Sequence, residues 1–315
     1  MRGRRGVLGV VASGARVLLL CVFAFAAVIA GGGSGRGPSA SGASVPIRVV
    51  AAENFWGSVA AQLAGDRAQT RSIITNPATD PHDYEPTPAD GKTLARAQYV
   101  IVNGAGYDPW APRLLNANPV AGRRVLDMGK LVGVKEGGNP HLWYSPVFVR
   151  RGIDQITSDL KQLDPADAAY FDRQRSAYLT QGLRQCDTLR AQIRQKYAGV
   201  PVGSTESIFV YLGQDLNLKI LTPPGFMNAI SEGTDPTAAD KAAFDRQIET
   251  KQIKVLVFNT QNATPDVQAL VKKAKARGIP VTTITETLDP ANLSYQAWQS
   301  QQLQRLADAL AAARR

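Results

Sequence analysis

One stretch near the middle of the chain, residues 165–197, reads PADAAYFDRQRSAYLTQGLRQCDTLRAQIRQKY. It contains a single glycine, and Asp164-Pro165 before an acidic first turn is typical of a helix N-terminus. Apolar residues recur in it at spacings of three and four, namely Leu179, Leu183, Cys186, Leu189, Ile193 and Tyr197. The spacing predicts one long helix with a continuous apolar stripe. Cys186 lies on that stripe, so we expect it to be a small buried residue without a reactive role.

Short β-branched runs alternate with helical segments on both sides of this stretch. The predicted strands before it are 47–51, 71–75, 99–102 and 124–126, with helices near 56–64 and 91–97. The predicted strands after it are 201–204, 219–221, 254–258 and 280–284, with helices near 208–212, 238–250 and 265–277. This alternation is typical of parallel sheets covered by helices.

We therefore predict an α/β fold of two Rossmann-like lobes, each a parallel sheet flanked by helices, joined by one long rigid linking helix. The N-terminal lobe spans 46–163, the linking helix 164–198 and the C-terminal lobe 199–315. Ligands of such folds bind beyond the carboxyl ends of the strands, so we expect a cleft between the lobes at those ends.

The first 45 residues have the pattern of an export signal followed by a tether. Arginines precede an apolar run of 14 residues, Val17 to Ala30, which is short for a membrane span and ends on a small residue. Residues 1–30 are therefore predicted to be a signal peptide and residues 31–45, rich in Gly and Ser, a flexible tether. Leu20 before Cys21 departs from a lipoprotein signal, but lipid attachment at Cys21 remains an alternative to cleavage near Ala30.

Charge and cysteine content exclude several classes of protein. Four arginines of the predicted signal peptide account for part of the formal net charge of +10, leaving +6 for a body in which basic and acidic residues are interleaved. No basic stripe suggests a nucleic-acid partner. After cleavage Cys186 would be the sole cysteine, which excludes an internal disulfide and argues against a cysteine-based metal or catalytic site.

The two histidines of the chain both directly follow a proline in a short polar loop. His82 lies in Asp80-Pro81-His82-Asp83-Tyr84-Glu85-Pro86, and His141 lies in Asn139-Pro140-His141-Leu142-Trp143. A loop stiffened by proline fixes the direction of an imidazole, as a metal ligand requires. The pair therefore indicates a metal site, although the spacing matches no local zinc motif.

Four short motifs occur in order along the chain: Glu53-Asn54-Phe55-Trp56-Gly57, the segment from Asp80 to Asp90, Asn103-Gly104-Ala105-Gly106-Tyr107-Asp108-Pro109-Trp110, and Asn139-Pro140-His141-Leu142-Trp143. In this order they resemble the zinc and manganese solute-binding proteins of ABC importers, the cluster A-I binding proteins. The resemblance extends from about Val45 to the C-terminus. It implies a two-lobed protein that holds one divalent transition-metal ion with four side chains, two from each lobe.

The resemblance assigns the four ligand positions to His82, His141, Glu206 and Glu286. Glu286 stands where the family usually has an aspartate, and Asp289 is the alternative for this position. Two neutral imidazoles and two carboxylates would neutralise a divalent ion, and each glutamate follows a predicted strand at the cleft edge.

Acids near these motifs are candidates for turn formation or for orienting an imidazole through its other N–H, namely Asp80, Asp83, Glu85 and Asp235. No histidine-rich loop is present, so the metal is left open between zinc and manganese, with zinc slightly favoured by its higher affinity for nitrogen and oxygen ligands.

The sequence therefore predicts an exported monomer, periplasmic or attached to the outer face of the cytoplasmic membrane, that binds zinc or manganese and delivers it to an ABC permease. One alternative is an adhesin or surface interaction protein that uses Trp110, Trp143 and Trp298 if they are exposed. Others are a mononuclear metal enzyme and a binding protein for an organic solute. An enzyme is disfavoured because no nucleophile motif or phosphate-binding loop occurs.

Overall fold

The computed structural model describes residues 45–79, 81 and 84–314. The predicted signal peptide, residues 31–44 of the predicted tether, Cys21 and His82 lie outside the described residues. None of the helices in the described part of the chain has the length and hydropathy of a membrane span.

The first sheet has four parallel strands in the order β2-β1-β3-β4. Its elements are β1 (Ile47–Glu53), α1 (Asn54–Ala64), η1 (Gly65–Arg67), β2 (Ala68–Ile74), α2 (Pro88–Ala95), β3 (Tyr99–Val102), α3 (Trp110–Ala117), β4 (Arg124–Asp127), α4 (Met128–Val132), η2 (Leu142–Tyr144) and α5 (Pro146–Leu163). Alternate residues of a strand face opposite sides of a sheet. Val49 and Ile101 accordingly pack with α1 and α5, whereas Val50 and Val100 pack with α2 and α3.

The second sheet repeats this plan in the order β6-β5-β7-β8, again with all strands parallel. Its elements are β5 (Pro201–Ser204), η5 (Ser207–Phe209), α8 (Val210–Asp215), β6 (Lys219–Ile220), α9 (Pro224–Ser231), α10 (Ala238–Glu249), β7 (Val255–Asn259), α11 (Pro265–Ala276), β8 (Val281–Ile284) and α12 (Tyr295–Ala312). Two four-stranded parallel sheets flanked by helices confirm the predicted fold class. We call the parts of the chain around the first and second sheets the N-terminal and C-terminal lobes.

The linking segment of the structure differs from the predicted helix at its middle. The observed segment consists of η3 (Pro165–Asp167), α6 (Ala168–Ala177), a π-helical turn η4 (Tyr178–Gly182) and α7 (Arg184–Tyr197). The Leu183 amide donates to the Tyr178 carbonyl at 2.9 Å, five residues back. A Cβ at Gly182 would lie 2.7 Å from the Tyr178 ring, so the glycine allows that ring to lie on the backbone of the turn. The prediction of one uninterrupted α-helix was therefore wrong at this turn.

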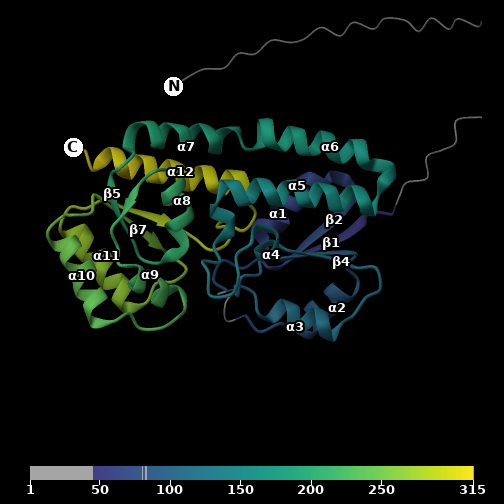
Figure 1. Ribbon diagram of the computed structural model, residues 1–315, viewed down its shortest axis with the longest axis horizontal. Helices are drawn as coiled ribbons and strands as arrows, with labels where there is room; N and C mark the ends of the chain where they lie inside the picture. The colour runs from purple at the N-terminus through teal and green to yellow at the C-terminus, as the bar shows by residue number, and fades with distance from the viewer. Residues whose placement is uncertain (1–44, 80, 82–83, 315) are drawn as a thin grey trace, which may run out of the picture. The chain divides into compact units, whose positions relative to one another are not determined.

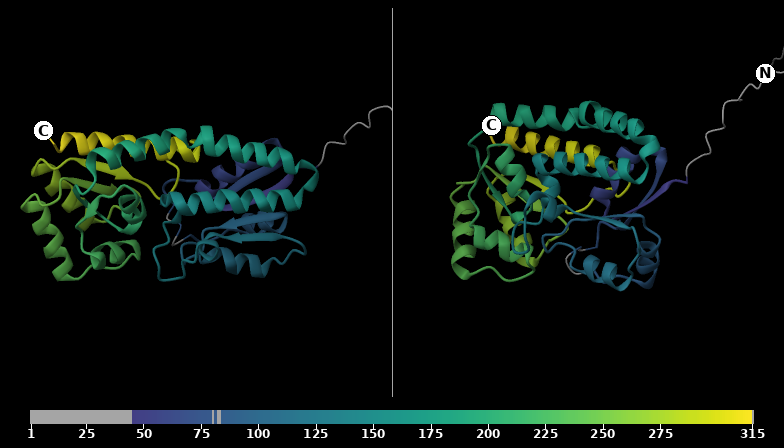
Figure 2. Two further views of the ribbon diagram at one scale, coloured as in Figure 1. Left: turned by 45° about the horizontal axis from the view of Figure 1, so that its top comes forward. Right: turned by 45° about the vertical axis from the view of Figure 1, so that its right-hand side comes forward.

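Two long helices, α5 and α12, are absent from the sequence-based prediction. In Figures 1 and 2 they lie alongside the linking segment, α5 next to α6 and α12 next to α7. α12 packs on β8 and also reaches α1 of the other lobe. Each of the two helices starts at a serine whose side chain accepts an amide hydrogen bond, Ser145 for α5 and Ser294 for α12.

Besides a hydrophobic cluster within each lobe, one cluster runs through both lobes. It contains Val49 and Ile101 of the first sheet, Val202 and Val257 of the second, and the buried stripe of α7, which includes Cys186. The Cys186 thiol is free, buried and in contact with the Ser300 hydroxyl. The expectation of a small buried residue is thus confirmed.

Both sheets reverse their strand order at a central strand, β1 in the first and β5 in the second. Beyond the carboxyl ends of strands beside such a reversal, adjacent connections run to opposite faces of the sheet and leave a crevice. Asn103 follows β3 in the first lobe, Thr205 and Glu206 follow β5 in the second, and Asn259 ends β7. In both lobes, therefore, the fold places polar side chains at the carboxyl ends of the strands.

Candidate metal site

His141 lies in the loop between α4 and η2 and is fully buried. Its ring packs edge-on against Trp143 and Tyr107. The oxygen Oδ1 of Asn139 accepts a hydrogen bond from the His141 backbone amide at 3.0 Å and lies 2.7 Å from Nδ1 of the ring. Because this oxygen can only accept, the proton of the neutral imidazole belongs on Nδ1. Nε2 therefore carries the lone pair that a metal would use.

Glu206 and Glu286 come from the C-terminal lobe and approach the same imidazole nitrogen. Glu206 follows β5 by two residues, and Glu286 follows β8 by two. Oε1 of Glu206 lies 3.7 Å from Nε2 of His141, and Oε2 of Glu286 lies 3.4 Å from it. One ligand atom from each of the three side chains falls within 4.8 Å of the others, a grouping that could hold a metal ion.

Neutral hydrogen-bond donors surround the two carboxylates. The amide of Asn262 donates to Oε2 of Glu206 at 2.8 Å, and the amide of Asn259 donates to Oε1 of Glu286 at 2.7 Å. The Tyr107 hydroxyl, from the N-terminal lobe, donates to Oε2 of Glu286 at 3.0 Å. Glu286 is thus held by donors from both lobes, and Glu206 by a donor from its own lobe.

Burial makes the charged forms of this cluster unfavourable in the protein alone. It raises the pKa of Glu206 well above its ordinary value, and the nearby charge of Glu286 raises it further. Burial lowers the pKa of His141 to about 4, against the opposing effect of the Glu206 carboxylate. A divalent cation would remove the repulsion between the carboxylates and would bind the neutral form of the imidazole.

The structure brings together three of the four predicted site residues, His141, Glu206 and Glu286, while His82 lies outside the described residues. Asp289, the alternative to Glu286, is exposed, whereas Glu286 is 6 % exposed. The geometry therefore brings Glu286, and not Asp289, to the cluster.

The nearby acids were predicted to form turns or to orient an imidazole, and the structure shows neither Glu85 nor Asp235 in contact with His141. Glu85 and Asp235 are exposed, and Asp80 and Asp83 lie outside the described residues. The His141 ring is oriented by Asn139, two residues before it in the same motif. Exposed loop acids are well solvated, whereas a buried imidazole needs a neutral acceptor that can be buried with it.

Two asparagines, Asn259 at the end of β7 and Asn262 in the loop after it, were not predicted as site residues. The resemblance assigned Glu206 and Glu286, whose positions after parallel strands supported that assignment; Asn259 and Asn262 likewise lie at and just beyond the carboxyl end of a parallel strand.

The three tryptophans considered for a surface interaction are buried: Trp110, Trp143 and Trp298 are each at most 1 % exposed. Trp143 stacks on Phe55 with ring centroids 4.1 Å apart. They pack the interior, so the structure gives no exposed tryptophan at these positions for an adhesin surface.

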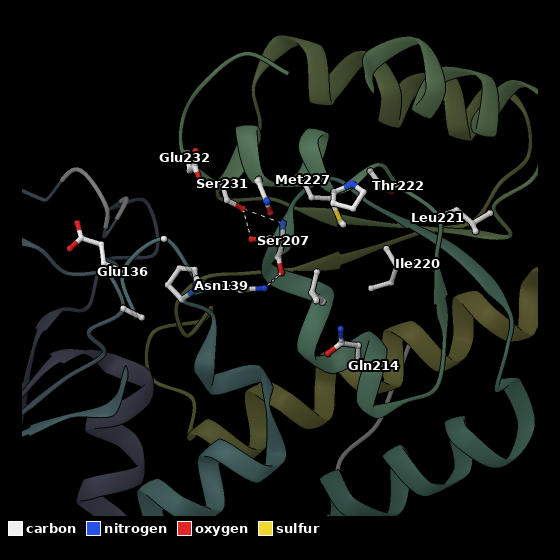
Figure 3. A pocket seen from close by; sticks show the side chains of 18 of the residues that line it. Glu136, Asn139, Ser207, Gln214, Ile220, Leu221, Thr222, Met227, Ser231 and Glu232 are labelled. Atoms are coloured by element: carbon white, nitrogen blue, oxygen red, sulfur yellow. Dashed lines mark hydrogen bonds between the residues drawn. The ribbon is translucent and has the colours of Figure 1, made fainter. Parts of the chain in front are cut away.

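A cavity of about 770 Å³ lies beside the cluster, on the Nδ1 side of His141. Figure 3 shows Glu136 on one wall and Ser207, Ser231 and Glu232 on the other. Asn139 reaches across it, donating from its amide to the Ser207 carbonyl at 2.8 Å. Residues of both lobes therefore line this cavity next to the cluster.

Two parallel-sheet lobes that share a buried cluster of candidate metal ligands are the architecture of a bilobal binding protein. The chain belongs to the family described as "Zinc-uptake complex component A periplasmic", whose model matches residues 49–309. The resemblance found in the sequence motifs is thereby confirmed.

Relatives and solved structures agree with this assignment. The chain is 22 % identical over 319 residues to the high-affinity zinc uptake system protein ZnuA of Bacillus subtilis (strain 168), covering 95 % of this chain and 97 % of that protein. It is 26 % identical over 201 residues to the manganese ABC transporter substrate-binding lipoprotein PsaA of Streptococcus pneumoniae, covering 57 % and 62 %. The Mn-bound periplasmic metal binding protein from candidatus liberibacter asiaticus has the same fold, with a TM-score of 0.69 at 18 % identity over 84 % of this chain and 99 % of that one.

Proposed function

We propose that this chain binds one divalent transition-metal ion, zinc or manganese, outside the cytoplasm and delivers it to the permease of an ABC importer. The observation that carries the proposal is the buried cluster of His141, Glu206 and Glu286, which converges from both lobes. Relatives named for zinc uptake and for manganese transport support it.

The ligands of the proposed site are His82, His141, Glu206 and Glu286. The donor set is two nitrogens and two carboxylate oxygens, whose charge of −2 would balance the ion. Oε1 of Glu206 is buried and accepts no hydrogen bond from the described residues. Burying a carboxylate oxygen without a hydrogen-bond donor or a cation beside it costs folding free energy, and a bound metal ion would supply that partner.

We infer a binding role and not catalysis. The three described ligands are buried, His141 completely, whereas a catalytic metal keeps a position open for substrate. The protein is proposed to act as an exported monomer without a nucleic-acid partner, with residues 1–30 as its signal peptide. Lipid attachment at Cys21 is the alternative to cleavage.

Metal titration of the purified mature chain tests this function. Zinc and manganese should each be offered to chelator-treated protein while binding stoichiometry and the unfolding midpoint are measured. We expect one ion per chain and a rise in the midpoint, because a ligand that binds only the folded state stabilises it. His141→Ala should lose both effects while Asp289→Ala keeps them. A parent chain whose midpoint neither metal moves would refute the proposal.

A further inference from the structure

Four basic side chains line a cavity of about 230 Å³ in the N-terminal lobe, which we call the basic cavity. Arg48 comes from β1, Arg71 from β2, and Lys92 and Arg96 from α2 and its C-terminal end. All four residues are exposed, and the other residues that line the cavity are uncharged. Because the four lie far apart in the sequence, they form no basic stripe there, and only the fold gathers them.

The register of the first sheet explains how the two arginines of the strands reach one cavity. Arg48 is paired with Gln69, and Val50 with Arg71, across the parallel strands β1 and β2. Residues two apart in a strand, and residues paired across neighbouring strands, have side chains on the same face of a sheet. Val50 packs with α2 and α3, so Arg48 and Arg71 lie on the face that α2 covers. In Figure 1 this face lies opposite to α5 and the linking segment.

The protein itself does not neutralise the charge of the basic cavity. Other cations have carboxylate partners, for example Arg67, Arg124 and Lys130. None of the four cations of the cavity pairs with a carboxylate of the described residues. Lys92 and Arg96 are four residues apart at the end of one helix, a spacing at which like charges repel. A bound anion would relieve this repulsion.

Arg48 is held at the wall of the cavity by two hydrogen bonds. Its Nε donates to the Arg96 carbonyl, and its backbone amide donates to Oε1 of Gln98 at 3.0 Å. The guanidinium group is thereby fixed at Nε, while its two terminal nitrogens donate to none of the described residues. A guanidinium held in this way presents N–H donors whose geometry matches the oxygens of a phosphate group.

The size and polarity of the basic cavity favour a phosphate group over a protein partner. Its lining consists of the four cations, Gln69, Thr93 and two buried valines of β1. The centre of a protein interface is instead built from exposed apolar and aromatic residues. The larger cavity beside the candidate metal site has the opposite charge, since it is lined by Glu136 and Glu232 and by no basic residue. The two cavities therefore suit ligands of opposite charge.

We propose that the basic cavity binds the phosphate groups of anionic phospholipids on the outer face of the cytoplasmic membrane. This inference goes beyond the proposed function and takes from it the location of the chain outside the cytoplasm. Cleavage near Ala30 would leave the protein without a membrane anchor, and contact with anionic lipids would then keep it close to the permease. Arg48 is the second residue of β1, so the cavity lies toward the amino end of this strand, whereas the candidate metal site lies beyond the carboxyl ends.

Vesicle co-sedimentation tests the proposal with the chain from residue 31 onward, which lacks Cys21 and therefore carries no lipid. The vesicles consist of phosphatidylcholine alone or of equal parts of phosphatidylcholine and phosphatidylglycerol. We expect the parent to bind the anionic vesicles in preference, and less tightly as sodium chloride is added. The combined variant Arg71→Gln, Lys92→Gln, Arg96→Gln should bind them at least about 10-fold more weakly, because each basic residue near an anionic surface contributes about fivefold.

A matched control removes the same charge from exposed positions of the other lobe. It combines Lys272→Gln, Lys275→Gln and Arg277→Gln at the end of α11, and it should bind the vesicles as the parent does. Arg48 is kept in both variants because it holds the end of α2. Circular dichroism and metal titration should show that both variants keep the fold and the metal affinity of the parent, since the six substitutions lie away from the candidate metal site.

The outcomes that overturn the proposal are distinct from those that overturn the proposed function. Equal loss of binding in the two combined variants would show that net charge, and not this cavity, attracts the vesicles. A parent without preference for anionic vesicles would also overturn the proposal, and inorganic phosphate that binds this parent in isothermal titration would assign the cavity to a free anion. A chain that takes up no metal but binds anionic vesicles through this cavity would overturn the proposed function and not this inference.

Discussion

The two halves of the candidate site differ in charge and in how they are held. The N-terminal lobe presents the neutral ring of His141, oriented by an asparagine two residues away and packed against aromatic rings. The C-terminal lobe presents two carboxylates, Glu206 and Glu286, each held by an amide from the end of a third strand. A neutral ligand can be buried with local contacts alone, whereas two like charges need donors brought together by the whole sheet.

The largest expected effect comes from removing a carboxylate of the charged half. Glu286→Ala should weaken metal binding by more than about 100-fold, beyond the range usual for residues that only orient ligands. Asp289→Ala should leave the affinity unchanged, since Asp289 is exposed. Isothermal titration of both variants checks this. Full affinity in Glu286→Ala with a collapse in Asp289→Ala would reverse the assignment.

A smaller effect is expected in the neutral half. Asn139→Ala removes the acceptor for Nδ1 of His141, so the ring can take the wrong tautomer or turn. We expect a loss of about 10- to 100-fold in zinc affinity with stoichiometry retained. Competition titration measures it, with Asn228→Ala, at an exposed position of α9, as the control. An affinity equal to that of the parent would show that the aromatic contacts suffice to orient the ring.

In the metal-free protein, His141 and Glu206 should make the folding stability depend on pH in opposite directions. The pKa of His141 is lowered to about 4, so its contribution to stability is lost as the pH falls from about 6.5 to 4. The pKa of Glu206 is raised, so the folded state binds more protons than the unfolded state and stability falls as the pH rises above about 4.5.

Glu206→Gln should therefore raise the unfolding midpoint of the metal-free protein at pH 7.5 while abolishing tight metal binding. A gain of about 2 °C or more is expected, the effect of roughly 1 kcal/mol in a protein of this size. The gain should shrink toward pH 4.5. Thermal unfolding in chelator measures it, with exposed Glu85→Gln as the control. A midpoint at or below that of the parent at pH 7.5 would contradict the repulsion argued here.

The smallest expected effect concerns a second buried carboxyl pair, in the N-terminal lobe. Burial and the neighbouring Asp108 raise the pKa of Glu53 well above its ordinary value, and burial raises that of Asp108 to about 6. Asp108 accepts hydrogen bonds from the backbone amides of Asn103 and Gly104 at 2.7 and 2.8 Å. Asp108 differs from the glutamates of the site in having backbone donors in place of side-chain amides.

Glu53→Gln should stabilise the protein slightly at pH 7.5, by about 1 °C or more, and not at pH 4. The sign follows because a raised pKa lowers stability only above the unfolded value of about 4.5. Thermal unfolding at the two pH values checks this, with exposed Glu136→Gln for comparison. A stabilisation of the same size at both pH values would show that the gain does not come from the charge of Glu53.

Sequence reasoning located the strands well because their positions depend on local patterns. All eight strands in the described part of the chain were predicted, with ends that differ by a few residues. It missed α12 because that helix buries glutamines: Oε1 of Gln302 accepts from the Thr285 amide and the Tyr144 hydroxyl. Glutamine is usually a surface residue, so a glutamine that is buried against a partner distant in sequence interrupts the apolar pattern by which a helix such as α12 is recognised.

The residues of the candidate cluster were predicted from the sequence, and the contacts that support them were not. His141 carries its own signal, a proline-framed loop, whereas the resemblance to the family assigned Glu206 and Glu286. Asn259 reaches Glu286 across 27 residues of sequence and Asn262 reaches Glu206 across 56. Such pairings depend on the order of strands in the sheet, which the residues around each asparagine do not encode.

The hydrophobic cluster that the two lobes share has a consequence for how the protein unfolds. Each lobe has a hydrophobic cluster of its own, but side chains of both sheets, α7 and α12 pack together in a further cluster that the two lobes share. Cutting the chain between the lobes would expose apolar surface on both fragments, so neither is expected to remain folded alone. Heating should accordingly melt residues 45–314 in a single cooperative calorimetric transition, and the metal should raise that one transition as a whole.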